Sequence, residues 1–306
     1  MSAVHILLRQ SIDYAGLFPP AGLDMGTAAG NYAQYLGGES AWALGRFILP
    51  SSRLGEFESA AGDLLLRTGG ARPWRLAALA GPDLAADLQQ IDEFNQRHGA
   101  AAAGAAIVDT LEAKAGSVGA VEDTIRRTPR QLQTYLEIPV ERDPGELVAA
   151  IARLGGRAKV RTGGVTRDAF PSPGDLVRFI AASVQARVPF KATAGLHHPL
   201  RAEYRLTYAG DSPRGAMFGF LNLFLAAGFI REGMPDAEAL ELLQEPAAGA
   251  LQANEQGISW RGHRLDAEAL RRAREDTIVS FGSCSFTEPI EELQALHLLD
   301  PRAQPA

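Results

Sequence analysis

The sequence has little of several things that mark well-defined protein classes. It has one cysteine, Cys284, so no disulfide can form within the chain. Acidic residues outnumber basic ones and the net charge is −6, which argues against a nucleic-acid partner because such proteins usually present a basic face. The longest apolar run, 215–230, contains Asn222 and three glycines and is shorter than the roughly 20 residues of a membrane span. These absences predict a cytoplasmic protein with no nucleic-acid or membrane partner.

Lysine is nearly absent as well. Of the 30 basic residues only Lys114, Lys159 and Lys191 are lysine. The chain therefore places nearly all of its positive charge on arginine, whose guanidinium stays protonated and cannot act as a nucleophilic amine. Two of the three lysines stand in short apolar runs that look like buried strands, AKVRTGG (158–164) and PFKATAG (189–195). This placement indicates a chemical task for the two amines, and chance placement of three lysines is the alternative.

What the chain does contain is a regular alternation of short apolar runs and amphipathic stretches. Hydrophobic residues make up 46% and charged residues 22% of its 306 residues, which suits one large globular domain. Six strand-like runs are each followed by a helical stretch: 46–50, 75–81, 105–113, 134–140, 157–164 and 189–195. This alternation predicts a parallel sheet with right-handed crossovers.

Two further segments decide the size of the sheet. The segment 257–265 is predicted to be a strand or a small hairpin, and 277–286 a last strand. Counting both gives eight strands, the number in a TIM-like (β/α)8 barrel. The predicted fold is therefore an α/β barrel of this type, which can be irregular. Residues 1–45 are predicted to form an N-terminal cover or lid segment, and residues 46–306 a single α/β barrel domain. The Gly/Pro-rich stretch 13–22 either closes a pocket or plugs the bottom of the barrel.

Alternation within the strands indicates which side chains enter the barrel. In three consecutive strands, apolar residues occupy one parity and polar residues the other. The face that packs against the outer helices must be apolar, so the polar parity is predicted to point inward. This places Glu137, then Lys159 with Arg161, then Lys191 with Thr193 in one interior, near the carboxyl ends where such barrels bind substrate. The alternative is a salt-bridge network that only fills the barrel.

Two amines and a guanidinium in one pocket have a predictable electrostatic consequence. Neighbouring positive charges and desolvation both disfavour protonation, so we expect one lysine to have a lowered pKa and a free amine near neutral pH. A neutral buried amine attacks carbonyl carbon to form a Schiff base, and Glu137 and the second cation can then move protons. Lys159 has the closest positive neighbours and is predicted to be the nucleophile. Arg161 predicts an anionic substrate, because an unpaired buried guanidinium is costly.

The segment from about residue 145 to 200 resembles the core of class I, Schiff-base aldolases of the deoxyribose-phosphate aldolase type. In that family one strand carries K-x-x-T-G and, after a helix, a second strand carries V-x-x-K-A-x-x-G. The matching positions are Lys159, Thr162, Gly163, Val188, Lys191, Ala192 and Gly195. The resemblance implies a lyase on a barrel, with Lys159 as the Schiff-base lysine and Lys191 as the cation that lowers its pKa.

The resemblance also implies a catalytic carboxylate on each of two upstream strands, for which Asp109 and Glu137 are the candidates. Thr162 of the first motif would then belong to the substrate site. The sequence departs from the family at Arg161, where the family has a small hydroxyl residue. It departs again at GLHHPLR (195–201), which replaces a Gly-Gly-Ile-Arg phosphate-binding turn. The family's substrate is therefore not expected to carry over.

Polar residues beyond the second lysine strand supply further candidates. His197 and His198 are adjacent and point opposite ways in an extended segment, so they cannot chelate one ion as a pair; one of them is predicted to contact substrate or to act as acid or base. Arg201 is a candidate anion clamp, with solvated surface charge as the alternative. Ser283 lies in the small-residue run SFGSCS (280–285), where free backbone N–H groups could bind an anion. Cys284 is left without a role.

These observations lead to one main hypothesis and two alternatives. The main hypothesis is a lysine-dependent, aldolase-like lyase that acts on a small anionic carbonyl compound and needs no metal or other cofactor. The first alternative is a metal-dependent lyase or hydrolase built on Glu137, His197 and His198. The second is a barrel that binds an anion without catalysis. The substrate and its phosphorylation, the direction of reaction and assembly into a homo-oligomer are left open by the sequence.

Overall fold

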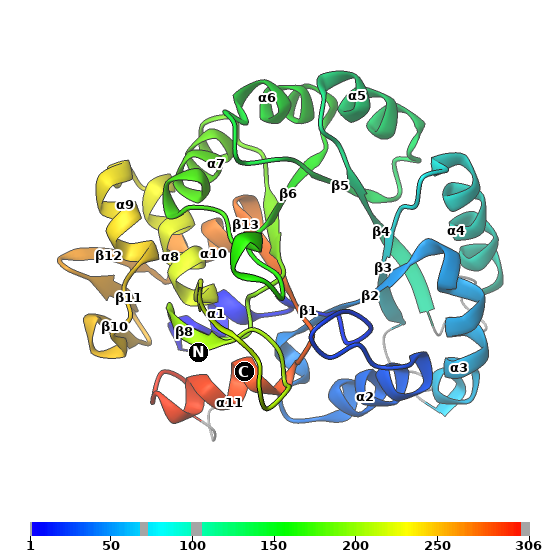
Figure 1. Ribbon diagram of the computed structural model, residues 1–306, viewed down its shortest axis with the longest axis horizontal. Coiled ribbons are helices and arrows are strands. Elements are labelled where there is room, and N and C mark those ends of the chain that lie inside the picture. The colour runs from blue at the N-terminus through cyan, green and yellow to red at the C-terminus, as the bar shows by residue number, and fades with distance from the viewer. Residues whose placement is uncertain (1, 68–72, 99–105, 301–306) are drawn as a thin grey trace.

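A closed barrel of eight parallel strands forms the centre of the protein (Figure 1). The computed structural model describes residues 2–67, 73–98 and 106–300. The strands follow one another around the barrel in chain order, and the last pairs with the first. They are β1 (Ile12–Tyr14), β2 (Leu44–Pro50), β3 (Trp74–Leu79), β4 (Ala106–Lys114), β5 (Gln133–Glu137), β6 (Arg157–Arg161), β7 (Phe190–Thr193) and β13 (Ile278–Ser283). The predicted (β/α)8 barrel is confirmed.

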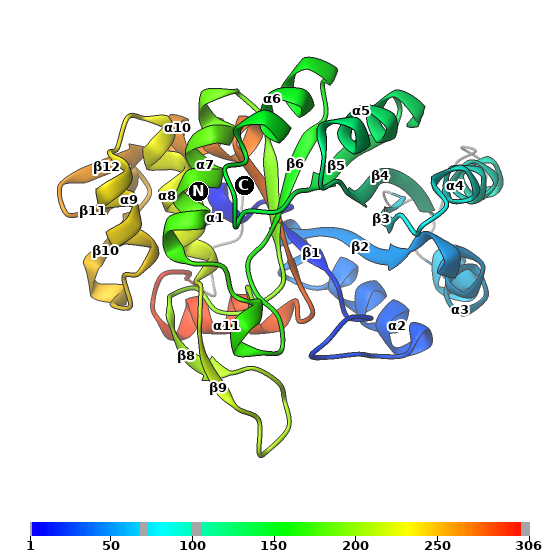
Figure 2. The same ribbon diagram turned by 45° about the horizontal axis from the view of Figure 1, so that its top comes forward.

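Helices form a layer around this barrel, and one helix follows each of its strands (Figures 1 and 2). In chain order they are α2 (Met25–Gly37), α3 (Leu54–Arg67), α4 (Leu84–His98), α5 (Val118–Arg127), α6 (Gly145–Leu154), α7 (Pro173–Gln185), α8 (Phe220–Arg231) and α11 (Thr287–Ala295). Outward-facing strand residues such as Leu136, Val160 and Phe190 are fully buried against this layer. The hydrophobic core therefore lies between the strands and the helices. The polar residues that alternate with these apolar ones along the strands face the barrel interior.

Local sequence signals fix where several helices begin and end. Ser172 caps α7 and forms a reciprocal capping box with Asp175, and Pro173 occupies the first turn, where its missing N–H costs nothing. Gly155 ends α6 with a left-handed φ of 72°, a conformation that glycine adopts without a steric penalty. These signals fix where the loops between helices and strands begin. The loops that follow the strands lie at the carboxyl end of the barrel, where such barrels bind substrate.

The N-terminal boundary predicted from the sequence is wrong. Residues 1–45 are not only a cover, because β1 lies in this segment and closes the barrel between β13 and β2. The strand was missed because it is three residues long, too short to show a period. Residues Ala15, Phe18, Pro19 and Pro20, which follow β1, line a cavity at the carboxyl ends of the strands. The stretch 13–22 therefore contributes both a strand and part of a pocket wall.

The segment 257–265 forms a hairpin outside the barrel, so it is not the eighth strand. Its strands β11 (Gly257–Trp260) and β12 (His263–Asp266) join β10 (Leu251–Asn254) in a small antiparallel sheet beside α9 (Asp236–Leu243). Helices α1 (Ala3–Leu8) and α10 (Ala267–Asp276) pack together nearby. These additions cover α8, whose residues 220–230 are all buried. The long apolar run of the sequence is therefore a helix buried within the protein.

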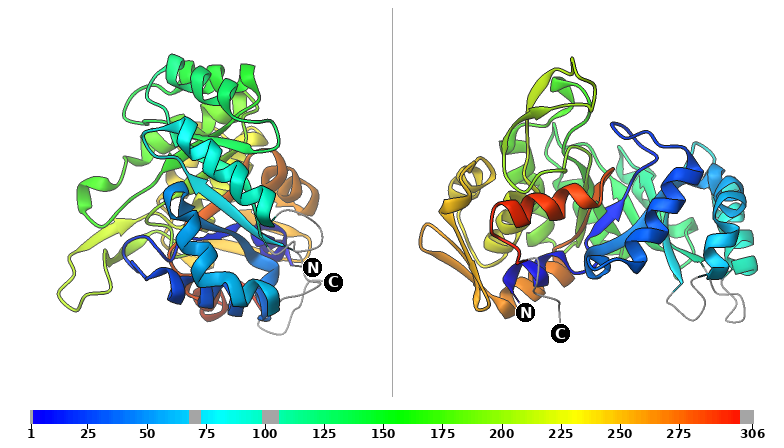
Figure 3. Two further views of the ribbon diagram at one scale, coloured as in Figure 1. Left: turned by 90° about the vertical axis from the view of Figure 1, so that its right-hand side faces the viewer. Right: turned by 90° about the horizontal axis from the view of Figure 1, so that it is seen from below.

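A second insertion lies between β7 and α8. Strands β8 (Ala202–Arg205) and β9 (Arg214–Met217) form a hairpin that projects from the body of the protein, on the side away from helix α1 (Figure 3). This is the side on which the loops after the barrel strands lie. Among the described residues, no helix is long and apolar enough to cross a membrane. The cytoplasmic location stays a prediction.

Candidate active site

The charged residues of three neighbouring strands point into the barrel as their parity predicted. Glu137 on β5 is in register with Lys159 on β6, and Lys159 is in register with Lys191 on β7. The residue after each lysine, Val160 on β6 and Ala192 on β7, faces the helix layer and is fully buried. Neighbouring strands thus bring one carboxylate and two amines together.

Carboxylates from two further strands complete this group. Lys191 Nζ lies 2.5 Å from Asp13 Oδ2 and 2.6 Å from Glu112 Oε1. Lys159 Nζ lies 2.8 Å from Glu112 Oε2 and 3.0 Å from Glu137 Oε2. One carboxylate, that of Glu112, therefore holds both amines. We call these five residues the lysine cluster; with three carboxylates and two ammonium groups its net charge is negative.

This arrangement overturns the expectation of a lowered lysine pKa. Burial acts to lower the pKa of Lys159, but the carboxylates of Glu112 and Glu137 outweigh burial and the pKa is raised. Burial likewise opposes protonation of Lys191, yet Asp13 and Glu112 raise its pKa. The same contacts lower the pKa of Glu112 to about 2 despite its burial. The expectation failed because it counted the cations of the pocket and missed two of its carboxylates.

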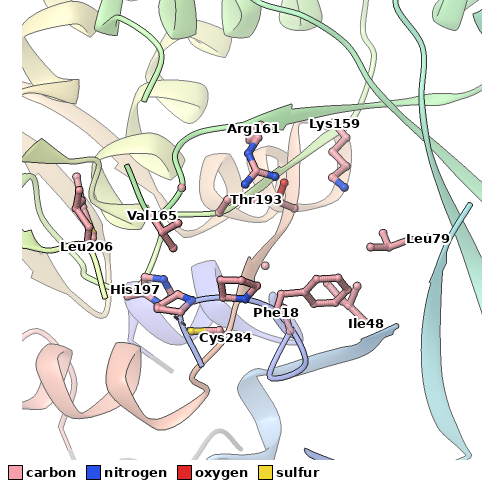
Figure 4. A pocket seen from close by; sticks show the side chains of 18 of the residues that line it. Phe18, Ile48, Leu79, Lys159, Arg161, Val165, Thr193, His197, Leu206 and Cys284 are labelled. Carbon is pink, nitrogen blue, oxygen red and sulfur yellow. Dashed lines mark hydrogen bonds between the residues drawn. The ribbon is translucent and has the colours of Figure 1, made fainter. Parts of the chain in front are cut away.

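Access separates the two lysines. Lys191 is 1% exposed and Lys159 is 7% exposed, and only Lys159 lines the cavity at the carboxyl ends of the strands. In Figure 4, Lys159 and Arg161 enter this cavity from one side and face Phe18, His197 and Cys284 on the other. A ligand in the cavity can therefore reach the amine of Lys159, whereas Lys191 lies behind it.

The cavity has two lobes that share Lys159 in their walls. One lobe, of about 220 Å³, has largely apolar walls and is called the apolar lobe; its apolar residues include Phe18, Ile48, Val165, Leu206 and Met217. The other, of about 1040 Å³, is called the polar lobe; its charged residues include Asp83, Lys114, Asp123, Arg127 and Glu137. Glu112 and Arg161 also belong to both walls. The lysine cluster thus lies at the junction of two unlike spaces.

Arg161 lies at the mouth of the cavity and not in its depth. Its side chain is exposed, which corrects the expectation of a buried guanidinium. Within the described part of the chain this side chain forms no hydrogen bond or ion pair, in contrast to the lysines below it. It is therefore available to an anionic ligand.

Two glycines four residues after the lysines shape the wall beside the site. A Cβ atom on Gly163 would meet the ring of Phe170 at 2.4 Å, and one on Gly195 would meet the same ring at 2.9 Å. Gly195 also needs glycine for its left-handed φ of 71°. The glycines of the two lysine motifs thus admit one aromatic ring between the β6 and β7 loops. Thr162 joins these loops, because its hydroxyl donates to the carbonyl of Ala194 at 2.7 Å.

Thr162 and Asp109 are not where the sequence placed them. Thr162 is fully buried and its hydroxyl is used by the backbone, so its role is structural, whereas Thr193 does line the cavity. Asp109 binds Arg46 Nε at 2.5 Å and Arg75 Nε at 2.7 Å and contacts neither lysine. Asp109 belongs to a separate ionic group lower in the barrel.

A bulge in β4 separates Asp109, which the family resemblance suggested, from the carboxylate that contacts the lysines. The pairing with β3 jumps from Leu76↔Val108 to Ala77↔Thr110, so Asp109 is an extra residue and the parity changes there. The inward residue of the upper strand is Glu112. Its signal was present in the sequence, because Thr110, Glu112 and Lys114 alternate with apolar residues.

Asp13 is the other missed member of the cluster. It is fully buried, and its Oδ2 accepts hydrogen bonds from Lys191 at 2.5 Å and from Ser280 at 2.8 Å. Its Oδ1 accepts from the backbone N–H of Arg46 at 2.8 Å. The sequence does contain a signal for this position, because the charged Asp13 stands between two apolar residues, Ile12 and Tyr14. The signal was not used, since the segment was predicted to be a cover and not a strand.

His197 and Cys284 form the wall opposite Lys159. His197 Nδ1 lies 3.7 Å from Cys284 Sγ and 3.3 Å from Ser283 Oγ. Burial, with His198 beside it, lowers the pKa of His197 to about 4, so the ring is neutral at pH 7. Burial raises the pKa of Cys284, which keeps it a thiol. The side chains of His197 and Cys284 are therefore uncharged. Ser283 contacts His197 but does not line the cavity.

The metal site considered from the sequence is not assembled. Glu137 binds Lys159, and His198 is stacked on Tyr204 and lies 2.6 Å from Glu292. Within residues 2–67, 73–98 and 106–300, the one group of three potential ligands whose atoms lie within 4.8 Å of one another is His198, Glu288 and Glu292. Glu137, His197 and His198 therefore do not form a common centre.

Arg201 also lies away from the cavity. Its guanidinium lies 4.7 Å from the centre of the Phe218 ring, and it is not among the residues of either lobe. Burial lowers its pKa. The anion clamp predicted at Arg201 is therefore not part of this cavity.

Comparisons of the chain with models of protein families, with curated proteins and with solved structures found no match. The chemistry of the site must therefore be inferred from its own residues.

Proposed function

We propose that the protein is a lysine-dependent lyase that forms a Schiff base between Lys159 and a small anionic carbonyl compound. The observation that carries the proposal is the position of the Lys159 amine, which lines the cavity and contacts two carboxylates. A nucleophilic amine needs both access to substrate and a nearby group that takes its proton. The resemblance of the two lysine strands to class I aldolases points to the same residue.

Glu137 is the group best suited to take the proton. Its Oε2 is 3.0 Å from Lys159 Nζ, and it lines the polar lobe. Glu112 is a poor acceptor, because two ammonium groups hold its pKa at about 2. Lys191 takes no part in bond making in this proposal; it helps to keep Glu112 ionised and holds the side chains of Asp13 and Glu112 in place.

The reaction then follows the general course of amine catalysis. Lys159 passes a proton to Glu137, and its neutral amine adds to the carbonyl carbon. Glu137 returns its proton as the oxygen leaves as water, and a protonated imine remains. The imine draws the electron pair of the bond between its α and β carbons as that bond breaks, while the hydroxyl on the β carbon gives its proton to a carboxylate and becomes the carbonyl of the departing fragment. Protonation of the resulting enamine on carbon and addition of water release the second fragment and restore Lys159.

Borohydride trapping tests the proposal directly. The protein is incubated with a panel of aldehydes, ketones and 2-oxo acids, reduced, and mapped by peptide mass spectrometry. We expect a reduced adduct on Lys159. An adduct on Lys191 instead would reverse the two roles, and no adduct on any lysine across the panel would leave a barrel that binds anions without covalent chemistry.

A further inference from the structure

The third lysine of the chain lies at the same site as the other two. Lys114 ends β4, is in register with Glu137 on β5, and lines the polar lobe. The chain has 30 basic residues and three lysines, and all three are thus gathered around one carboxylate-rich junction. Lys114 is exposed, and within the described residues its side chain forms no ion pair or hydrogen bond.

Free and paired charges are unevenly distributed over the polar lobe. Arg127 is bound to Asp123 at 3.1 Å, and Glu137 is bound to Lys159. Among the described residues of this lobe, the charged side chains without a partner of opposite charge are Lys114, Arg161 and Asp83, and Asp83 Oδ1 accepts from the backbone N–H groups of Ala85 and Ala86. A group that enters this lobe therefore meets two unpaired cations and one carboxylate that backbone N–H groups already bind, and this favours an anion.

The apolar lobe offers the opposite environment. Ile48, Leu206 and Met217 line it and are each buried within the fold, and the neutral wall of His197 and Cys284 adds no charge. Val165 completes this lobe at the surface, where it is 36% exposed. A ligand group that displaces water from these walls gains free energy only if it is apolar.

We infer that the substrate has two unlike ends, an anionic group that binds between Lys114 and Arg161 and an apolar branch that fills the lobe of Ile48, Val165 and Met217. The carbonyl lies between them, at Lys159, because Lys159 belongs to both walls. Only this last placement rests on the proposed Schiff-base function. The substrate class is therefore a carbonyl acid with a hydrocarbon branch, rather than a sugar, which would place hydroxyl groups against the apolar wall.

Four small probes separate the two ends and the carbonyl. 4-Methyl-2-oxopentanoate has all three features, pyruvate lacks the branch, 4-methyl-2-pentanone lacks the charge, and 4-methylpentanoate lacks the ketone. For the three ketones, the concentration that half-saturates borohydride trapping on Lys159 is measured. For 4-methylpentanoate, binding is measured by calorimetry. We expect the branched oxo acid to saturate at a concentration about tenfold or more below pyruvate, the order that burial of a branched alkyl group provides. It should saturate about fivefold or more below 4-methyl-2-pentanone, which lacks the charge.

Two substitutions with a matched control assign the ends to the lobes. Lys114→Met should weaken the two oxo acids about fivefold, the upper range for an exposed charge pair, and leave the neutral ketone unchanged. Val165→Asn should weaken the two branched ketones and leave pyruvate unchanged. Arg142→Met removes an exposed cation from the loop after β5 that lines neither lobe, and it should change none of them.

The outcomes distinguish this inference from the proposed function. If no ketone is trapped but 4-methylpentanoate binds and is weakened by both Lys114→Met and Val165→Asn, the two-ended site stands and the Schiff-base chemistry falls. If trapping on Lys159 occurs with equal half-saturation for pyruvate, 4-methyl-2-pentanone and the branched oxo acid, the chemistry stands and the two-ended site is overturned. Equal weakening by Arg142→Met would also overturn it.

Discussion

The barrel interior contains two ionic groups that are built from different cations. The lysine cluster lies toward the carboxyl ends of the strands and touches the cavity. The second group, which we call the arginine cluster, consists of Arg46, Arg75, Asp109 and Gln133 near the amino ends. In the arginine cluster, burial opposes the charge of Arg46, but Asp13 and Asp109 outweigh it and raise its pKa.

This difference separates a fixed charge from a movable one. A guanidinium remains protonated at every accessible pH and holds carboxylates in a set geometry, which suits a cluster that only fills and fixes the barrel. An ammonium group can give up its proton to a neighbour. A chain that uses arginine almost everywhere has a lysine, Lys159, where the proposed reaction needs a transferable proton, and it has arginine in the cluster near the amino ends of the strands.

The largest expected effect comes from making the two clusters alike. Lys159→Arg should abolish borohydride trapping completely, because a guanidinium cannot supply the nucleophile. Lys191→Arg is the matched control; it keeps a cation behind the site and should retain part of the trapping at Lys159. Peptide mapping measures both, and thermal unfolding shows whether each variant is folded. Trapping that survives Lys159→Arg would contradict the assignment.

Removing the hidden cation should have the next largest effect. Lys191→Met leaves Asp13 and Glu112 buried without their shared partner, so the free energy of unfolding should fall by about 4 kcal/mol, the order for breaking a buried ion pair. Chemical denaturation measures this loss. The double variant Lys191→Met/Asp13→Asn removes one orphaned charge and should recover part of it. A double variant less stable than Lys191→Met would show that charge is not the cause.

Glu137→Gln should slow trapping without removing the nucleophile. At pH 7 the rate should fall about 100-fold, a typical value for loss of a positioned proton acceptor. Since the pKa of Lys159 is raised, the variant depends on the small free-amine fraction, and its rate should rise about tenfold per pH unit. The wild type transfers the proton internally and should vary little between pH 7 and 9. Parallel pH profiles for the two proteins would argue against Glu137 as acceptor.

The smallest effect is expected in the arginine cluster. Asp109→Asn should lower the free energy of unfolding by about 2 kcal/mol, less than a fully buried pair would cost because Arg75 is partly exposed. Trapping at Lys159 should be unchanged. Asp123→Asn, which breaks an exposed pair with Arg127, serves as the control and should cost about 0.5 kcal/mol or less. A loss of trapping in Asp109→Asn would join the two clusters into one functional unit.

The sequence predicts the parts of this site that repeat a pattern over several residues. Strand parity placed Glu137, Lys159 and Lys191 in one interior, and the register of β5, β6 and β7 agrees. Alternation of strands and helices predicted the barrel, since each unit is long enough to show its period.

The sequence does not predict features that depend on one residue or on the closing of the barrel. Asp13 lies on a three-residue strand, and its contact with Lys191 spans 178 positions. The family resemblance suggested Asp109, but after a one-residue bulge in β4 the carboxylate that contacts both lysines is Glu112. The direction in which the lysine pKa shifts depends on the balance of all these charges. Overlooking the carboxylates of Asp13 and Glu112 was enough to give the wrong direction.

The carboxylates that hold Lys159 protonated have a second consequence. An ammonium group and a protonated imine carry the same single positive charge on the same nitrogen. Glu112 and Glu137, 2.8 and 3.0 Å from that nitrogen at rest, would therefore stabilise the covalent intermediate by the attraction that raises the pKa of the free lysine. The two carboxylates are therefore already in position to stabilise the positive charge of the protonated imine, and no rearrangement of the site is needed when it forms.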